Sequence, residues 1–151
     1  MEGLQITVTN YSDKSWQRTK WEVGAGSSNE TNWPDEVTQT PAQTIEPRDG
    51  QTVAAAHSEH LTFIVKDALY MTLGYKSDIG EFAITAQQLF HMFGIGKQCE
   101  WSYMDPNSKK WSDSTTDTSP KEWQVGQYTI RATPSLDNTS ASVDVLIKNS
   151  H

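Results

Sequence analysis

The segment from residue 99 to residue 123, CEWSYMDPNSKKWSDSTTDTSPKEW, mixes aromatic and short polar side chains more densely than any other part of the chain. It contains three of the six tryptophans. A tryptophan offers a large apolar face and one N–H donor, which suits stacking on a sugar ring or insertion at a membrane interface. Short polar side chains supply the hydrogen bonds that such ligands need. The segment therefore predicts a surface that recognises a sugar, a lipid headgroup or another protein.

Two of the tryptophans lie in strongly polar surroundings. Trp33 lies in the loop predicted at 24–34, beside a proline, and Trp111 lies within the polar stretch 109–119. Isolated large aromatic side chains in polar loops lower solubility, so their exposure indicates a binding role. Trp21 and Trp101 have strand-like neighbours instead, and we expect both to pack in the core. The predicted ligand-binding residues are Trp33, Tyr103, Asp105, Asn107, Trp111 and Asp113.

The oxygen-rich residues of this segment also allow a calcium site as an alternative. Its ligands would be Asp105, Asn107, Asp113 and Asp117. The EF-hand spacing is absent, because there is no central glycine and no closing glutamate. Short Asp and Asn side chains also cap turns without any metal. We therefore predict no metal site here.

The chain carries no recognisable catalytic motif. It has no G-x-S-x-G, no H-E-x-x-H, no phosphate-binding glycine loop and no C-x-x-C. His57, Glu59 and His60 lie close in sequence, but a zinc site needs three or four converging ligands, so a polar strand edge is the simpler interpretation. A carboxylate pair such as Glu100 and Asp105 occurs in any acidic domain. We predict a protein that is not an enzyme and that has no cofactor.

Composition limits the class of partner. The 151 residues carry a net charge of −7, with 35% hydrophobic and 10% aromatic residues. This aromatic content excludes disorder, and the length fits a single domain spanning residues 1–151. Nucleic acid is excluded as a partner, because the twelve Lys and Arg residues are scattered and form no basic stripe. Anionic lipid would not attract the chain by bulk charge.

Alternating side chains predict strands at both ends of the chain. Leu4, Ile6 and Val8 alternate with polar residues, and a similar alternation runs through residues 141–147. We expect these two strands to lie near each other in one sheet. Residues 99–104 also alternate, which predicts a strand with Cys99, Trp101 and Tyr103 on one face.

The middle of the chain predicts the core. The apolar runs 61–65 and 68–75 indicate a hairpin that needs cover on both faces, which favours two packed sheets. Residues 84–95 cluster apolar side chains at spacings of three and four, which predicts a short helix, with a strand as the competing interpretation. The predicted fold is all-β: a single antiparallel β-sandwich with one short helix.

Three stretches are similar to the aegerolysins, a family of small acidic β-sandwich proteins. They are the first strand with its Asn-Tyr-Ser end at residues 6–12, the Ile-Glu-Pro lead-in at residues 45–47, and the final strand at 143–147. The resemblance implies a soluble domain that binds membrane lipids, sometimes within a lytic or insecticidal system. The family's Gly-Thr-x-Gly segment is missing after Glu59, so no site residue is taken from the family.

Together these patterns predict a non-enzymatic protein that binds membrane lipid or glycolipid. The alternative is a soluble lectin that binds free glycans with the same residues. A third interpretation is a structural or storage protein whose tryptophans are all packed. A protein partner or homo-oligomer is compatible with each. The N-terminal residues lack the pattern of a signal peptide and no apolar run is long enough to cross a membrane, which predicts a cytoplasmic protein or one secreted without a signal peptide.

Overall fold

The computed structural model describes residues 3–25, 36–57, 67–91 and 96–150. Every regular element within these ranges is a β-strand. The strands are β1 Gly3–Asn10, β2 Trp16–Ala25, β3 Glu36–Gln39, β4 Thr44–Ile45, β5 Gly50–His57, β6 Asp67–Lys76, β7 Glu81–His91, β8 Gly96–Met104, β9 Lys121–Val125, β10 Tyr128–Leu136 and β11 Ser140–Asn149. No helix in the described part of the chain is long and apolar enough to span a membrane.

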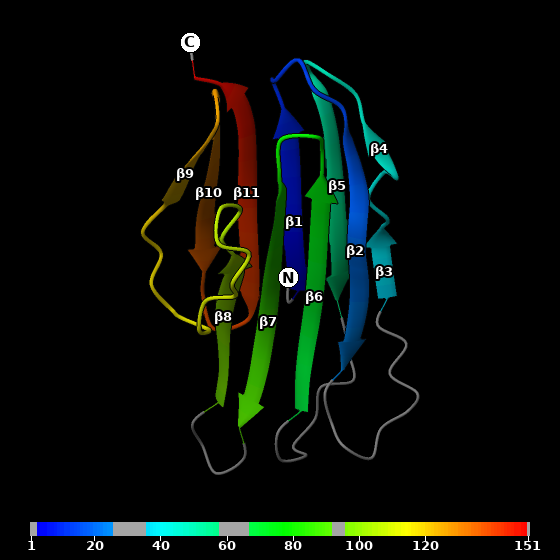
Figure 1. Cartoon of the computed structure of the whole chain (residues 1–151). Coiled ribbons are helices and arrows are strands. Elements are labelled where there is room, and N and C mark those ends of the chain that lie inside the picture. The colour runs from blue at the N-terminus through cyan, green and yellow to red at the C-terminus, as the bar shows by residue number, and fades with distance from the viewer. Residues whose placement is uncertain (1–2, 26–35, 58–66, 92–95, 151) are drawn as a thin grey trace.

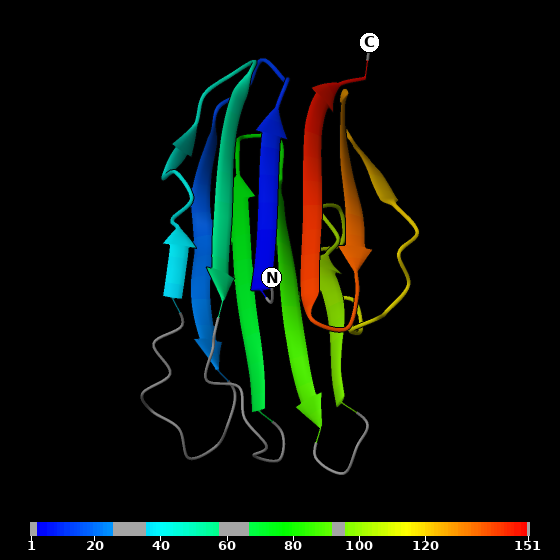
Figure 2. The same ribbon diagram turned by 180° about the vertical axis from the view of Figure 1, so that it is seen from behind.

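The strands form two sheets that pack face to face, as Figures 1 and 2 show from opposite sides. Sheet A has the order β3-β5-β1-β11-β10-β9, and sheet B has the order β4-β2-β6-β7-β8. The all-β, two-sheet prediction is therefore confirmed. Among the described strands, pairing is antiparallel except between β1 and β11, which run parallel with Leu4 opposite Ala141. The prediction that the first and last strands lie near each other is thus correct. Both strands lie in the interior of sheet A and not at its edges.

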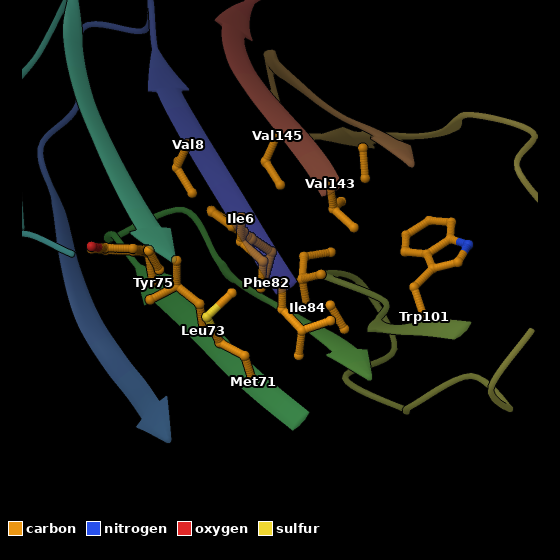
Figure 3. Packing of buried hydrophobic residues seen from close by; sticks show 14 of the residues in the cluster. Ile6, Val8, Met71, Leu73, Tyr75, Phe82, Ile84, Trp101, Val143 and Val145 are labelled. Carbon is orange, nitrogen blue, oxygen red and sulfur yellow. The ribbon is translucent and has the colours of Figure 1, made fainter. Parts of the chain in front are cut away.

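The core lies between the sheets and follows from the period-two alternation of the strands. Leu4, Ile6 and Val8 of β1 are all buried against residues of β6 and β7 in sheet B. Figure 3 shows Ile6 and Val8 among the buried side chains of the cluster, with Trp101 at its edge. Removing a side chain of this size from water stabilises a fold by about 1.5–3 kcal/mol. The alternating apolar residues thus hold the two sheets together.

The predicted helix at residues 84–95 is wrong for the residues that the structure describes. Glu81–His91 is strand β7, paired with β6 on one side and β8 on the other. Phe82, Ile84 and Ala86 face the core at a spacing of two, while Thr85 and Gln87 are partly exposed. Pairing on both edges satisfies the backbone, and this tertiary context overrides the apolar clustering that resembled a helix.

The hairpin predicted between the apolar runs 61–65 and 68–75 can be compared with the structure only for its second run. From Leu69 to Lys76, β6 is flanked by β2 and β7, so neither of its edges is open to another strand. Residues 61–65 lie outside the described residues. The second apolar run does form the centre of sheet B, as its burial on the core face requires.

Candidate functional site

The chain after β8 folds back along the outer edge of that strand. The Asp105 carboxylate accepts hydrogen bonds from the amides of Asn107 at 2.7 Å and Ser108 at 3.2 Å, which forms a tight turn. The turn places Trp111 in a β-bridge with Met104. Thr115 then exchanges two backbone hydrogen bonds of 2.9 and 3.0 Å with Trp101. The segment therefore covers the β8 edge, which would otherwise expose unpaired backbone groups.

Three aromatic rings close the space between the sheets beside this edge. Tyr103 lies between Trp101 and Trp123, with ring centroids 5.2 Å apart on each side. Trp101 is fully buried, and its indole nitrogen donates to the Asp117 carbonyl at 2.8 Å. Trp123 comes from β9, so the cluster joins sheet B to sheet A. The prediction that Trp101 is a core residue is confirmed.

The Trp111 side chain lies on the opposite side of sheet B from the Trp101 side chain. Partners in a β-bridge project to the same side of a sheet, and Met104 projects away from the core cluster. Met104 and its cross-strand neighbour Ala83 are nevertheless buried, with 5% and 0% exposure. Trp111 itself remains 42% exposed. An aromatic side chain therefore lies on the outer surface of sheet B, next to a small apolar patch. We call this surface the outer face of sheet B.

Polar groups continue the outer face across the neighbouring strands. Thr72, Thr85 and Ser102 lie opposite one another on β6, β7 and β8. The Thr72 and Thr85 hydroxyls hydrogen-bond at 2.8 Å, which leaves one hydroxyl proton available for another acceptor. The row ends at Glu22 on β2, directly opposite Thr72. The face thus combines hydroxyl groups and a carboxylate with an exposed indole ring.

Two further hydrogen bonds fix side chains on this face. The Tyr70 hydroxyl donates to the Glu22 carboxylate at 2.9 Å. The Gln87 amide donates to the Ser114 hydroxyl at 3.1 Å, which ties β7 to the segment that carries Trp111. Side chains restrained in this way lose less conformational entropy when a ligand binds.

The predicted site residues do not all lie on this face. Trp33 lies outside the described residues. The Asp105 carboxylate holds the turn after β8. The side-chain amide of Asn107 donates to the Gln124 carbonyl of β9 at 3.0 Å. Tyr103 belongs to the interior aromatic cluster.

The remaining predicted residues are Trp111 and Asp113, and both are exposed. Sequence reasoning missed Glu22, Thr72 and Thr85, which carry the polar side of the outer face. Each lies on a strand at an outward position of the period-two alternation. That alternation was the available signal, but the cross-strand register that brings these residues together is not encoded locally.

Three of the four oxygen-rich residues considered for calcium, Asp105, Asn107 and Asp117, have other hydrogen-bond partners in the structure. The Asp117 carboxylate accepts from the Ser119 amide at 2.9 Å, and this backbone hydrogen bond lowers the pKa of Asp117. Within the described ranges, no three His, Cys, Asp or Glu side chains converge to hold a metal ion.

Comparisons with known proteins add no assignment. No protein-family model matches the sequence, and a search of curated proteins finds no match. The resemblance to the aegerolysins therefore stays a prediction.

Proposed function

We propose that this protein is a non-enzymatic binding protein that recognises carbohydrate on the outer face of sheet B. The sugar is carried by a glycolipid at a membrane surface or by a free glycan. The observation that carries the proposal is the position of Trp111, which is 42% exposed although a β-bridge fixes its backbone. An exposed aromatic ring on a fixed backbone matches the apolar face of a sugar ring at low entropic cost.

The polar part of the face supports the same ligand. Sugar hydroxyls both donate and accept, so they need partners of both kinds. The Glu22 carboxylate provides acceptors, and the Thr72–Thr85 hydroxyl pair retains one donor. Asp113, exposed two residues after Trp111, is proposed as a further acceptor at the rim.

The protein would bind a membrane only if the sugar it recognises is the headgroup of a glycolipid. Trp111 would contact the headgroup, and a glycolipid would bring the protein to the bilayer without any basic patch. A role in a cytolytic or insecticidal system is supported only by the resemblance to the aegerolysins. The soluble-lectin alternative uses the same contacts on free glycans.

Co-sedimentation with vesicles and binding to a free-glycan panel test the proposal together. The vesicles contain phosphatidylcholine, sphingomyelin or phosphatidylcholine with glycolipid. We expect binding to glycolipid vesicles or to glycans, and a loss of up to about tenfold in Trp111→Ala, because ring stacking contributes about 0.5–1.5 kcal/mol. Val37→Ala is the matched control, since Val37 is equally exposed but lies on sheet A.

Each arm has an outcome that counts against the proposal. Binding that Trp111→Ala leaves unchanged would exclude the outer face of sheet B as the site. Equal binding to vesicles with and without glycolipid would indicate phospholipid recognition. No binding to vesicles or glycans would favour the structural or storage interpretation. Trp33→Ala, measured in parallel, tests the second tryptophan predicted from the sequence.

A further inference from the structure

A separate pocket lies at the end of sheet B where β6 turns into β7. Its volume is about 400 Å³, and it is bounded by that turn, by the turn after β8 and by the end of β9. Lys76 and Lys109 are among the residues that line it, and so are the apolar residues Ile79 and Val125. The pocket therefore offers cationic groups beside an apolar surface.

More lysines than carboxylates lie at this pocket. The two acidic residues that line it already have lysine partners: Asp78 pairs with Lys14 at 3.1 Å, and Glu81 pairs with Lys20 at 3.1 Å. Within the described residues, neither the Lys76 nor the Lys109 ammonium group has a hydrogen bond or an ion pair. Counted with Lys14 and Lys20, four lysines therefore surround two carboxylates, in a chain whose net charge is −7.

The electrostatics of Glu81 show that the pocket charges act on one another. Partial burial opposes ionisation, but hydrogen bonds from Thr19 and Lys20 and the charges of Lys20 and Lys109 outweigh it and lower the pKa of Glu81. Glu81 is thus ionised at neutral pH and neutralises Lys20. Lys76, which lies opposite Glu81 on β6, and Lys109 have no ion-pair partner of their own in the part of the chain that the structure describes, and are the cations that could meet a ligand from outside.

The walls of the pocket are fixed by short-range contacts. The Ser77 amide donates to the Gly80 carbonyl at 2.9 Å, and the Ser77 hydroxyl accepts from the Ile79 amide at 3.2 Å. A Cβ atom on Gly80 would lie 3.1 Å from a Val125 methyl group, so this turn packs tightly against β9. The Ser77 hydroxyl accepts one bond and keeps its own proton for a ligand.

Lys109 is held in the left-handed conformation, with φ of 61°. Its amide donates to the Asp105 carbonyl at 2.7 Å, and the Asp105 amide donates to the Lys110 carbonyl at 2.9 Å. A non-glycine residue in this region costs of order 1 kcal/mol and persists only where neighbouring contacts enforce it. The backbone that presents the Lys109 ammonium group is therefore set before any ligand arrives.

We propose that this pocket binds a phosphate or sulfate group. Two ammonium groups and one hydroxyl donor suit a tetrahedral oxyanion, and the wall of Ile79 and Val125 suits the organic part of an ester. The site is distinct from the Trp111 surface and does not depend on sugar binding there. The same chemistry is offered by a phospholipid headgroup and by a soluble phosphate or sulfate ester.

Amide chemical shifts during titration with inorganic phosphate, and separately with inorganic sulfate, test the site. We expect saturable shifts confined to the turn around Ser77 and Gly80 and the turn around Asn107. The double variant Lys76→Gln/Lys109→Gln should bind at least about tenfold more weakly, because binding to these lysines is charge-assisted. Lys121→Gln/Lys148→Gln is the control, since it removes the same charge outside the pocket.

Shifts that are equally large in the pocket variant and the wild type would overturn the proposal, as would shifts that never saturate. Both pocket lysines are exposed, so the double variant should keep the wild-type melting temperature. Phosphatidylcholine vesicles with and without phosphatidylinositol phosphate then distinguish the source. Lysine-dependent sedimentation with the phosphorylated lipid identifies a headgroup ligand. Binding of inositol phosphate without sedimentation identifies a soluble ester.

Discussion

Trp101 and Trp111 are ten residues apart in one segment, yet they have opposite positions in the structure. Trp101 is fully buried, makes an indole hydrogen bond and stacks in the aromatic cluster with Tyr103. Trp111 pairs with the same strand but lies on its outer side and is 42% exposed. The difference shows that side-chain direction along β8 and its edge, and not local composition, decides which tryptophan is available to a ligand.

The largest effect in this comparison is expected for Trp101→Ala. The substitution removes a buried indole ring and leaves the Asp117 carbonyl without its donor, so we expect a loss of about 3–5 kcal/mol in the free energy of unfolding. Urea denaturation followed by circular dichroism measures it. A loss below about 1 kcal/mol would mean that the aromatic cluster is not part of the cooperative core.

Tyr75 extends the comparison to an aromatic side chain with a titratable end. It is buried, and its hydroxyl donates to the Ala42 carbonyl. Burial raises the pKa of Tyr75 to about 12, above the ordinary value of 10.0. Because the pKa is raised in the folded state, the buried neutral hydroxyl contributes to the free energy of unfolding in full below pH 10. This contribution is lost as the pH rises towards 12.

Denaturation midpoints measured between pH 9 and pH 12 check this expectation, with Tyr75→Phe as the control. The wild type should lose more stability over the upper part of this range than the variant, which has no hydroxyl at this position to ionise. Parallel curves for the two proteins would contradict the assignment to Tyr75.

Asp105→Ala should have a smaller effect. It removes the acceptor for the Asn107 and Ser108 amides, and comparable capping losses are about 1 kcal/mol. The same turn leads into the Trp111 bridge, so ligand binding should weaken together with stability. Asp105→Asn, which keeps an acceptor oxygen, should restore most of both. If Asp105 contacts the ligand directly, Asp105→Asn should keep stability and lose binding.

Trp111→Ala should have the smallest effect on stability, below about 0.5 kcal/mol for an exposed position outside the core cluster. Its effect on carbohydrate binding is expected to be the largest of the four. A large loss of binding with little loss of stability would distinguish Trp111→Ala from Trp101→Ala. A stability loss comparable to that of Trp101→Ala would indicate that Trp111 serves mainly to cover Met104 and Ala83.

The sequence predicted the parts of the fold that depend on local alternation. The strand at residues 141–147, the strand at 99–104 and the two-sheet class follow from period-two patterns and are confirmed. The helix predicted at 84–95 is wrong for the described residues up to His91, because an apolar cluster on a strand paired at both edges resembles a short helical face. Within the candidate site, the exposure of Trp111 was anticipated from its polar neighbours. The row of Glu22, Thr72 and Thr85 was not, since it exists only through long-range register.

The parallel pairing of β1 with β11 bears on how the chain folds. Leu4 and Ala141 are neighbours in sheet A although most of the sequence separates them. Such non-local pairing slows folding, because a long loop must close before the contact forms. During synthesis β1 has one of its two partners, β5, long before β11 emerges, so one edge stays open. The last strand is therefore expected to complete the fold, and a chain stalled before β11 should be the species most prone to aggregate.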